Sequence, residues 1–201
     1  MITEIIFDVE TKKLFSDITT DDPGQLGVSI VSVYKRTVQE DCTEVEGEMR
    51  SFWEKDFPSM WPWFEHADRI IGFNSLKFDV PALRPYAPTY FPTLPHFDIM
   101  ELVRQKIGRR IGLSALAKDT LGNEKIDVGT NAVIYWAKGD PVSLGKLQTY
   151  CEADVALTRD LYDAGRKTSK LKYTDRWNEI ATVEVDFSYP KPKIEPQIGL
   201  F

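Results

Sequence analysis

The sequence predicts an α/β protein built on a central mixed β-sheet flanked by helices. Two observations support this: β-branched, alternating segments typical of strands open the chain, and helical segments mixed with single short strands follow. The chain has 201 residues, 42% hydrophobic and 28% charged, which suits one globular domain with a single core. We therefore expect one domain over residues 1–187 and a separate terminal segment over residues 188–201.

The first third of the chain predicts an antiparallel meander. Strands are expected over residues 2–9, 26–34 and 35–45, because apolar and β-branched residues dominate these stretches. The Asp-Asp-Pro-Gly stretch at residues 21–24 is a strong turn signal that separates the first strand from the second.

The middle of the chain mixes helical and irregular signals. Aromatic residues at roughly helical spacing predict a core-packing helix over residues 49–66, interrupted by two prolines. A short buried strand is expected over residues 68–74, and a helix starts after it with Asp79 near its amino end. Five prolines within residues 81–95 exclude a regular helix and predict an ordered surface loop.

The second half is mostly helical. A short strand or turn is expected at residues 96–100, and helices over 114–121, 131–136 and 143–168. We expect the serine at the start of the 114–121 helix to cap it. The alternating stretch 183–187 predicts a strand of a terminal hairpin.

Composition excludes several classes of protein. No apolar run is long enough to span a bilayer, and the start of the chain lacks the basic region of a signal peptide. Cys42 and Cys151 fit no metal-ligand spacing, which favours a reduced, cytoplasmic protein. The net charge of −6 argues against a general nucleic-acid coat but is compatible with a nuclease that has a local basic groove.

Asp8 and Glu10 are the first chemical signal. Side chains alternate along a strand, so these two acids point to the same face at the end of a buried strand. Two neighbouring carboxylates repel each other unless a cation binds them, and hard divalent ions prefer carboxylate oxygens. On this stretch alone, a pair of solvated acids at a strand end explains the pattern equally well.

Further acids in the chain favour a metal site over a pair of solvated acids. Tyr150 and Asp154 are four residues apart and therefore share one face of the expected helix. Together with Asp79 and the first pair, they offer four carboxylates and one tyrosine hydroxyl. Four carboxylates that converge on one site favour a pair of divalent metal ions, the arrangement used for in-line phosphoryl displacement.

Three motifs resemble those of a known enzyme family. Phe7-Asp8-Val9-Glu10-Thr11 resembles the first motif of the DEDD exonucleases, and the stretch from Gly72 to Asp79, with Asn74 ahead of the acid, resembles the second. Tyr150 and Asp154 resemble the third motif in its tyrosine-bearing (DEDDy) form. The resemblance covers about residues 3–165. Within this family, the sequence is most similar to stand-alone relatives of the proofreading domain of B-family DNA polymerases.

The resemblance implies a ribonuclease-H-like fold and a 3′–5′ exonuclease that uses two divalent ions, Mg²⁺ or Mn²⁺. It assigns the metal ligands to Asp8, Glu10, Asp79 and Asp154. It assigns Tyr150 to orienting the attacking water, and Thr11, Asn74 and Phe78 to contacts with the substrate. The implied substrate is a single-stranded DNA 3′ end, which is shortened with release of nucleoside 5′-monophosphates.

The last five residues resemble a different motif. Gln197-Ile198-Gly199-Leu200-Phe201 is similar to the bacterial sliding-clamp-binding peptide, although Ile198 and Gly199 depart from its usual residues. The resemblance implies that Gln197, Leu200 and Phe201 contact a clamp, with the Pro-rich stretch 188–196 as a stiff tether. The alternative is an apolar tail without a partner.

Three questions stay open at the level of sequence. An exonuclease acting on RNA 3′ ends, or a catalytically silent nucleic-acid-binding module tethered to a clamp, would carry many of the same features. The basic residues Arg104, Lys106, Arg109 and Arg110 fit either a solvated face or a surface near the path of the strand. The aromatic residues of loop 81–95 fit either loop packing or stacking on bases.

Overall fold

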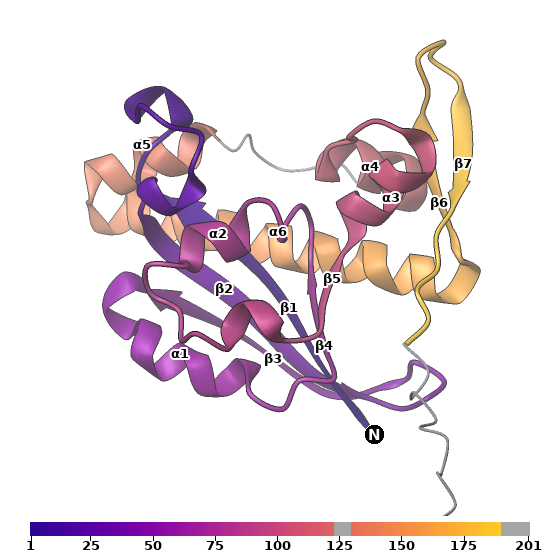
Figure 1. The fold of residues 1–201 in the computed structure, drawn as a ribbon, viewed down its shortest axis with the longest axis horizontal. Coiled ribbons are helices and arrows are strands. Elements are labelled where there is room, and N and C mark those ends of the chain that lie inside the picture. Colours follow the sequence, from indigo (N-terminus) through magenta and orange to yellow (C-terminus); the bar gives the residue numbers. More distant parts are fainter. Residues whose placement is uncertain (123–129, 190–201) are drawn as a thin grey trace, which may run out of the picture.

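The computed structural model describes residues 1–122 and 130–189 and confirms an α/β architecture (Figure 1). A five-stranded mixed sheet forms its centre, and a separate two-stranded hairpin follows the longest helix. The strands of the central sheet are β1 (Ile2–Thr11), β2 (Val28–Val38), β3 (Glu44–Trp53), β4 (Arg69–Gly72) and β5 (His96–Asp98). The hairpin consists of β6 (Lys170–Thr174) and β7 (Ile180–Glu184).

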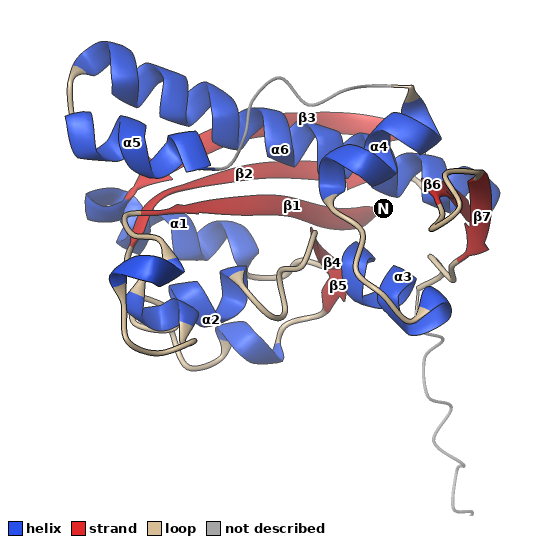
Figure 2. Cartoon of the chain, turned by 90° about the horizontal axis from the view of Figure 1, so that it is seen from above, coloured by secondary structure: helices blue, strands red, loops and turns tan. Residues whose placement is uncertain are grey.

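Helices cover both faces of the sheet (Figure 2). Helices α1 and α2 lie on one face and the long helix α6 on the other. The helices are α1 (Phe57–Phe64), α2 (Asp79–Leu83), α3 (Ile99–Ile107), α4 (Leu113–Leu121), α5 (Thr130–Lys138) and α6 (Pro141–Thr168). Among the described residues, no helix combines the length and apolarity needed to cross a membrane.

Strand β1 is the centre of the sheet, whose order is β3-β2-β1-β4-β5. Its side chains alternate between the two hydrophobic cores, one on each face of the sheet. Ile5, Phe7 and Val9 pack toward α1 and α2, whereas Ile6 packs toward α6. Asp8 has the same parity as Ile6, so the strand directs its carboxylate toward the α6 face.

The two edges of β1 are used differently. Strand β2 pairs with β1 in antiparallel register along the whole strand, from Ile2 to Thr11. Strand β4 pairs with it in parallel register only from Glu4 to Ile6. Beyond Ile6 the two parallel strands separate, and the carboxyl end of β1 borders an opening, which is where open α/β sheets place their ligands.

Two expected elements of the first third are wrong in their positions. The third strand is β3 (Glu44–Trp53) rather than residues 35–45, because β2 continues to Val38 and a turn with Cys42 in the left-handed region follows. Residues 49–53, expected to be helical, complete β3, and only Phe57–Phe64 forms a helix. Aromatic spacing was ambiguous here because Phe52 is buried from a strand and Phe64 from a helix.

The second half agrees with most expectations. Strand β4, the start of α2, strand β5, helix α6 and the hairpin β6–β7 are all present, although the hairpin strand ends at Glu184 rather than Phe187. Helix α4 begins after Gly112, so Ser114 is not its cap. Helix α3 was not expected; Asp98 caps its amino end and Gly108 ends it with a φ of +77°.

A buried polar network at the amino end of β1 anchors the end of the described chain. Glu4, fully buried, accepts hydrogen bonds from Arg36 (2.8 Å), Tyr162 (2.8 Å) and Tyr189. Arg69 donates to the carbonyl oxygens of Phe187 (2.8 Å) and Ser188 (2.6 Å). The contacts of the domain therefore continue through Tyr189, two residues past the expected boundary.

Two glycines of α6 test whether Phe187, near the end of the described chain, packs against this helix. A Cβ at Gly165 would overlap the buried ring of Phe187, whereas a Cβ at Gly145 would meet nothing. Gly165→Ala is expected to lower the free energy of unfolding by about 1–3 kcal/mol through overpacking. Gly145→Ala, the matched control, is expected to raise it by up to about 1 kcal/mol through helix propensity. Urea unfolding of both variants measures this, and equal effects would contradict the packing of Phe187 against α6.

Candidate active site

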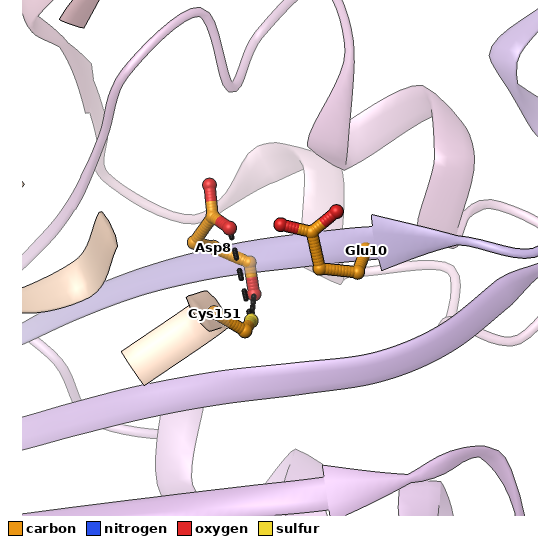
Figure 3. A group of neighbouring side chains, drawn as sticks. All are labelled: Asp8, Glu10 and Cys151. Atoms are coloured by element: carbon orange, nitrogen blue, oxygen red, sulfur yellow. Dashed lines mark hydrogen bonds between the residues drawn. The ribbon is translucent and has the colours of Figure 1, made fainter. Parts of the chain in front are cut away.

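The carboxylates of Asp8 and Glu10 lie side by side on β1 (Figure 3). One oxygen of each lies within 4.8 Å of the other and of the Cys151 Sγ. The Cys151 thiol donates to the Asp8 carbonyl oxygen (3.5 Å) and to its Oδ2 (3.7 Å). Burial, together with the charges of Asp8 and Glu10, raises the pKa of Cys151 well above its usual value, so the sulfur keeps its proton and acts as a donor.

Asp79 approaches the same strand from the other side. It is the first residue of α2, is only 4% exposed, and its Oδ1 accepts the backbone N–H of Val9 at 3.2 Å. That N–H is available because β4 no longer pairs with β1 at this point. Burial raises the pKa of Asp79 to about 7, with the charges of Asp98 and Asp154 acting in the same direction and the Val9 N–H opposing them.

Helix α6 supplies the third group of side chains. Tyr150, Cys151 and Asp154 are all buried on the face that packs against the sheet. The Tyr150 hydroxyl is hydrogen-bonded to Asp154. Burial raises the pKa of Tyr150 far above its usual value, and the charges of Asp154, Glu10 and Asp8 add to the effect. The phenol is therefore protonated at any ordinary pH.

One cavity of about 540 Å³ collects these side chains. Of the residues expected to form the site, it is lined by Asp8, Glu10, Thr11, Asn74, Phe78, Asp79 and Asp154. Tyr150 does not line the cavity, but its hydroxyl is hydrogen-bonded to Asp154, which does. Gln197, Leu200 and Phe201 lie outside the described residues, so the structure does not test the clamp-binding peptide.

The loop between β4 and α2 presents Asn74 to the cavity. Asn74 adopts a left-handed backbone conformation (φ +64°), and Asp98 holds it there. Asp98 accepts the N–H groups of Asn74 (2.9 Å) and Leu76 (3.0 Å) while it also caps α3. The side-chain oxygen of Asn74 is buried and accepts no hydrogen bond within residues 1–122 and 130–189.

The mouth of the cavity is apolar. Leu14 and Phe15 line it and are 39% and 45% exposed, and the ring of Phe15 packs edge-on against Phe78 at a centroid distance of 6.1 Å. Thr11 donates its hydroxyl to the Lys13 carbonyl oxygen at 2.9 Å and so shapes the turn that carries these residues. The cavity thus has an acidic floor and an apolar rim.

Sequence reasoning missed four residues of this site: Cys151, Asp98, Leu14 and Phe15. Cys151 had a usable signal, because it lies three residues before Asp154 and so near the same helix face. Asp98 also had one, because an acid between a short strand and a helix is typical of an N-cap. Of the three aromatic residues considered for base stacking, Tyr86 and Phe91 pack against the core. Tyr90 is 38% exposed, donates its hydroxyl to Glu65 at 3.0 Å and does not line the cavity.

The donor set suits hard divalent cations. Four carboxylates from three elements line one cavity, and Lys13 is the one basic residue among its described lining residues. Burial, with a smaller contribution from the charges of Asp98 and Asp154, raises the pKa of Asp79 and so disfavours its ionised form. Carboxylate oxygens are the ligands that Mg²⁺ and Mn²⁺ prefer, and the protonated thiol of Cys151 supports Asp8 rather than adding a soft ligand.

Comparison with known proteins agrees with this geometry. Residues 5–165 match the family model of the RNase_H superfamily. A solved structure of the family B DNA polymerase from the hyperthermophilic archaeon Pyrobaculum calidifontis is similar over 83% of this chain, with a TM-score of 0.60 and 18% identity. The chain spans about a quarter of that polymerase (25%). No curated protein matches the chain.

Asp79 predicts a pH dependence of stability in metal-free protein. Its pKa is raised on folding from 3.8 to about 7, so the folded state holds the proton more tightly than the unfolded state. The stability associated with the neutral carboxyl is complete below about pH 4 and is lost as the pH rises through 7. Three pKa units correspond to about 4 kcal/mol.

Asp79→Asn keeps the acceptor for Val9 and removes this titration. In EDTA, its free energy of unfolding is expected to exceed that of the wild type increasingly between pH 4 and pH 8. Urea unfolding at a series of pH values measures the difference, with the exposed Asp21→Asn as control. A difference independent of pH would show that Asp79 is ionised throughout.

Proposed function

Because the chain belongs to the RNase H superfamily, we propose that it is a metal-dependent 3′–5′ exonuclease that hydrolyses phosphodiester bonds at single-stranded DNA ends. The observation that carries the proposal is the convergence of Asp8, Glu10, Asp79 and Asp154 on one cavity. They come from β1, α2 and α6, and such a buried cluster of carboxylates is difficult to explain by stability alone. The reaction releases nucleoside 5′-monophosphates.

The four carboxylates would hold two Mg²⁺ or Mn²⁺ ions. When bound, such ions lower the pKa of a water, stabilise charge on the phosphoryl oxygens and assist the leaving oxygen. The chain keeps these ligands in place by separate contacts: the Val9 N–H holds Asp79, and the Cys151 thiol holds Asp8. Both donors are uncharged, so neither replaces the positive charge of a metal ion at the carboxylates.

Tyr150 positions the attacking water in this proposal. Its O–H is committed to Asp154, so the phenol oxygen can accept a hydrogen bond from a water beside that carboxylate. An acceptor here orients the water for in-line attack without taking its proton, which agrees with the high pKa of the phenol.

The rest of the cavity suits the end of a strand. The buried oxygen of Asn74 needs a donor, and among the groups at a strand terminus the 3′-hydroxyl supplies one whereas phosphate oxygens only accept. Leu14, Phe15 and Phe78 offer apolar surface to a terminal base. A 2′-hydroxyl is not excluded by these contacts, so RNA 3′ ends are the second candidate substrate.

An exonuclease needs the four carboxylates as metal ligands, whereas a catalytically silent binding module does not. A module that only bound nucleic acid would gain nothing from four carboxylates facing a polyanion. The intact set of acids therefore favours the enzyme over the module.

A cleavage assay tests the proposal. Matched 5′-labelled DNA and RNA 20-mers, with Mg²⁺, Mn²⁺ or EDTA, should show stepwise shortening from the 3′ end of DNA that requires the metal. Asp8→Ala should abolish it, because a ligand charge is lost while core packing is retained. Tyr150→Phe should lower kcat on the order of 10²-fold with little change in KM, because only the orientation of the water is lost.

The partly exposed Asp160→Ala on the same helix serves as the matched control and should cleave normally. Circular dichroism should show that every variant is folded. Full activity in Asp8→Ala would remove the metal assignment, and cleavage of RNA in preference to DNA would make the RNA enzyme the function. Equal kcat values for Tyr150→Phe and wild type would return Tyr150 to a packing role.

The terminal peptide supports recruitment to a bacterial sliding clamp in DNA replication or repair. Residues 197–201 are too few to fold alone, and Leu200 and Phe201 gain most by entering apolar pockets of a partner. The prolines of the preceding stretch limit the entropy lost on binding. Attachment to a clamp would raise the local concentration of the enzyme at DNA ends, so a weak peptide suffices.

Deletion of residues 197–201 is expected to leave cleavage of short free oligonucleotides unchanged. It should remove co-elution with a purified bacterial clamp and any stimulation by the clamp on primed DNA. The double variant Leu200→Ala/Phe201→Ala should reproduce the deletion, and Lys191→Ala should behave as wild type. A lower melting temperature in the deletion, with no clamp binding by the full chain, would show that the tail packs on its own domain.

A further inference from the structure

The hairpin β6–β7 carries exposed apolar surface. Trp177 at its tip is 68% exposed, and Ile180 at the start of β7 is 61% exposed. The guanidinium of Arg176 lies over the Trp177 ring at 4.2 Å from its centroid. An exposed tryptophan ring beside a guanidinium offers both an aromatic face and a positive charge to a ligand.

The hairpin is fixed to the helices beside it. Arg109, after the end of α3, donates to the Thr174 carbonyl oxygen (2.8 Å) and lies over the Tyr173 ring. Asp119 of α4 accepts a hydrogen bond from the Thr174 hydroxyl at 2.8 Å. The Thr120 hydroxyl donates to the Lys172 carbonyl oxygen and accepts from the Lys172 N–H. These contacts fix β6 against α4 and the end of α3, and we term residues 105–120 and 171–180 the hairpin surface.

The hairpin surface is basic although the chain is acidic. Residues 105–120 and 171–180 contain six exposed basic side chains: Lys106, Arg109, Arg110, Lys118, Lys172 and Arg176. They contain three acids, and two of these are engaged, Asp119 by Thr174 and Asp175 by the N–H groups of Trp177 and Glu179. Arg104, expected to join this group, instead pairs with Glu101 at 2.6 Å.

Helix α3 connects this surface to the cavity. It begins at Asp98, whose carboxylate holds the cavity loop at Asn74, and it ends next to the hairpin. Phe73 lines the cavity and also packs with the core of α3 and α4. The nine helical residues of α3 alone span about 13 Å, or about four nucleotides at the spacing of a stacked strand, and the hairpin tip lies farther on.

We propose that the hairpin surface binds the nucleic-acid strand four or more nucleotides behind the 3′ end, with Arg110 and Arg176 on phosphates and Trp177 stacked on a base. This rests on the proposed function, because the strand is the one whose end enters the cavity. Charge complementarity favours a polyanion, and an exposed aromatic ring beside a guanidinium is suited to bases of any sequence. The surface would tighten binding of long substrates without touching the reacting phosphate.

Substrates of two lengths test the proposal. Trp177→Ala and Arg110→Ala/Arg176→Ala should raise KM for a single-stranded 12-mer at least about 5-fold with kcat unchanged. Cleavage of a dinucleotide should be unaffected, because it does not reach the surface. The double variant should also reduce the salt dependence of 12-mer binding, by about 0.7 in slope for each phosphate that the protein no longer neutralises. Lys55→Ala/Lys146→Ala removes two exposed charges elsewhere and should match the wild type.

Binding measured without turnover separates this proposal from the proposed function. Fluorescence anisotropy of a labelled 12-mer with Asp8→Ala in EDTA should show the same loss of affinity when Trp177→Ala is added. If the wild type cleaves nothing yet this loss appears, the exonuclease fails and the surface stands. Unchanged 12-mer affinity in both hairpin variants overturns the proposal, as does light scattering that shows Trp177→Ala only dissociating a dimer.

Discussion

The hydrogen bond from the Val9 N–H to Asp79 depends on β1 having one edge paired and the other released. Strand β2 satisfies one edge along its full length, whereas β4 leaves the other after Ile6. A buried N–H must find an acceptor, and a carboxylate at the start of α2 supplies it. The same separation opens the cavity, so the divergence of two parallel strands both recruits Asp79 and exposes Asp8 and Glu10 to a ligand.

Local periodicity predicted those parts of the site that lie within one element. Asp8 and Glu10 follow from the two-residue repeat of a strand, and Tyr150 and Asp154 from the four-residue repeat of a helix. Asp79 required the resemblance to a family, because its contact with Val9 spans 70 residues. Local patterns place Asp98 at a helix start and Cys151 near the helix face of Asp154, but their contacts with the loop at Asn74 and with Asp8 on β1 are tertiary and follow from no local pattern. The β3 error has a similar origin: apolar spacing alone does not distinguish a buried strand from a helix.

Among the described residues that line the cavity of the acidic cluster, Lys13 is the one that carries a positive charge. The acids of the cluster are supported by an amide N–H, a thiol and a phenol. Each such donor stabilises a carboxylate less than a buried guanidinium would, and burial, together with the charges of Asp98 and Asp154, raises the pKa of Asp79. Four carboxylates held in this way supply the oxygen ligands that a divalent cation prefers.

The opposite end of β1 shows what the same strand does with an acid that is structural. Glu4 shares the parity of Asp8 and Glu10 and is fully buried, yet two arginines, Arg36 and Arg166, pair with it. Although burial opposes it, hydrogen bonds from Tyr189 and the charge of Arg36 hold the pKa of Glu4 below its usual value. One end of the strand thus pairs its buried carboxylate with two arginines. At the other end, the described lining of the cavity places one lysine, Lys13, beside four carboxylates, and such a set of oxygen ligands suits a divalent cation.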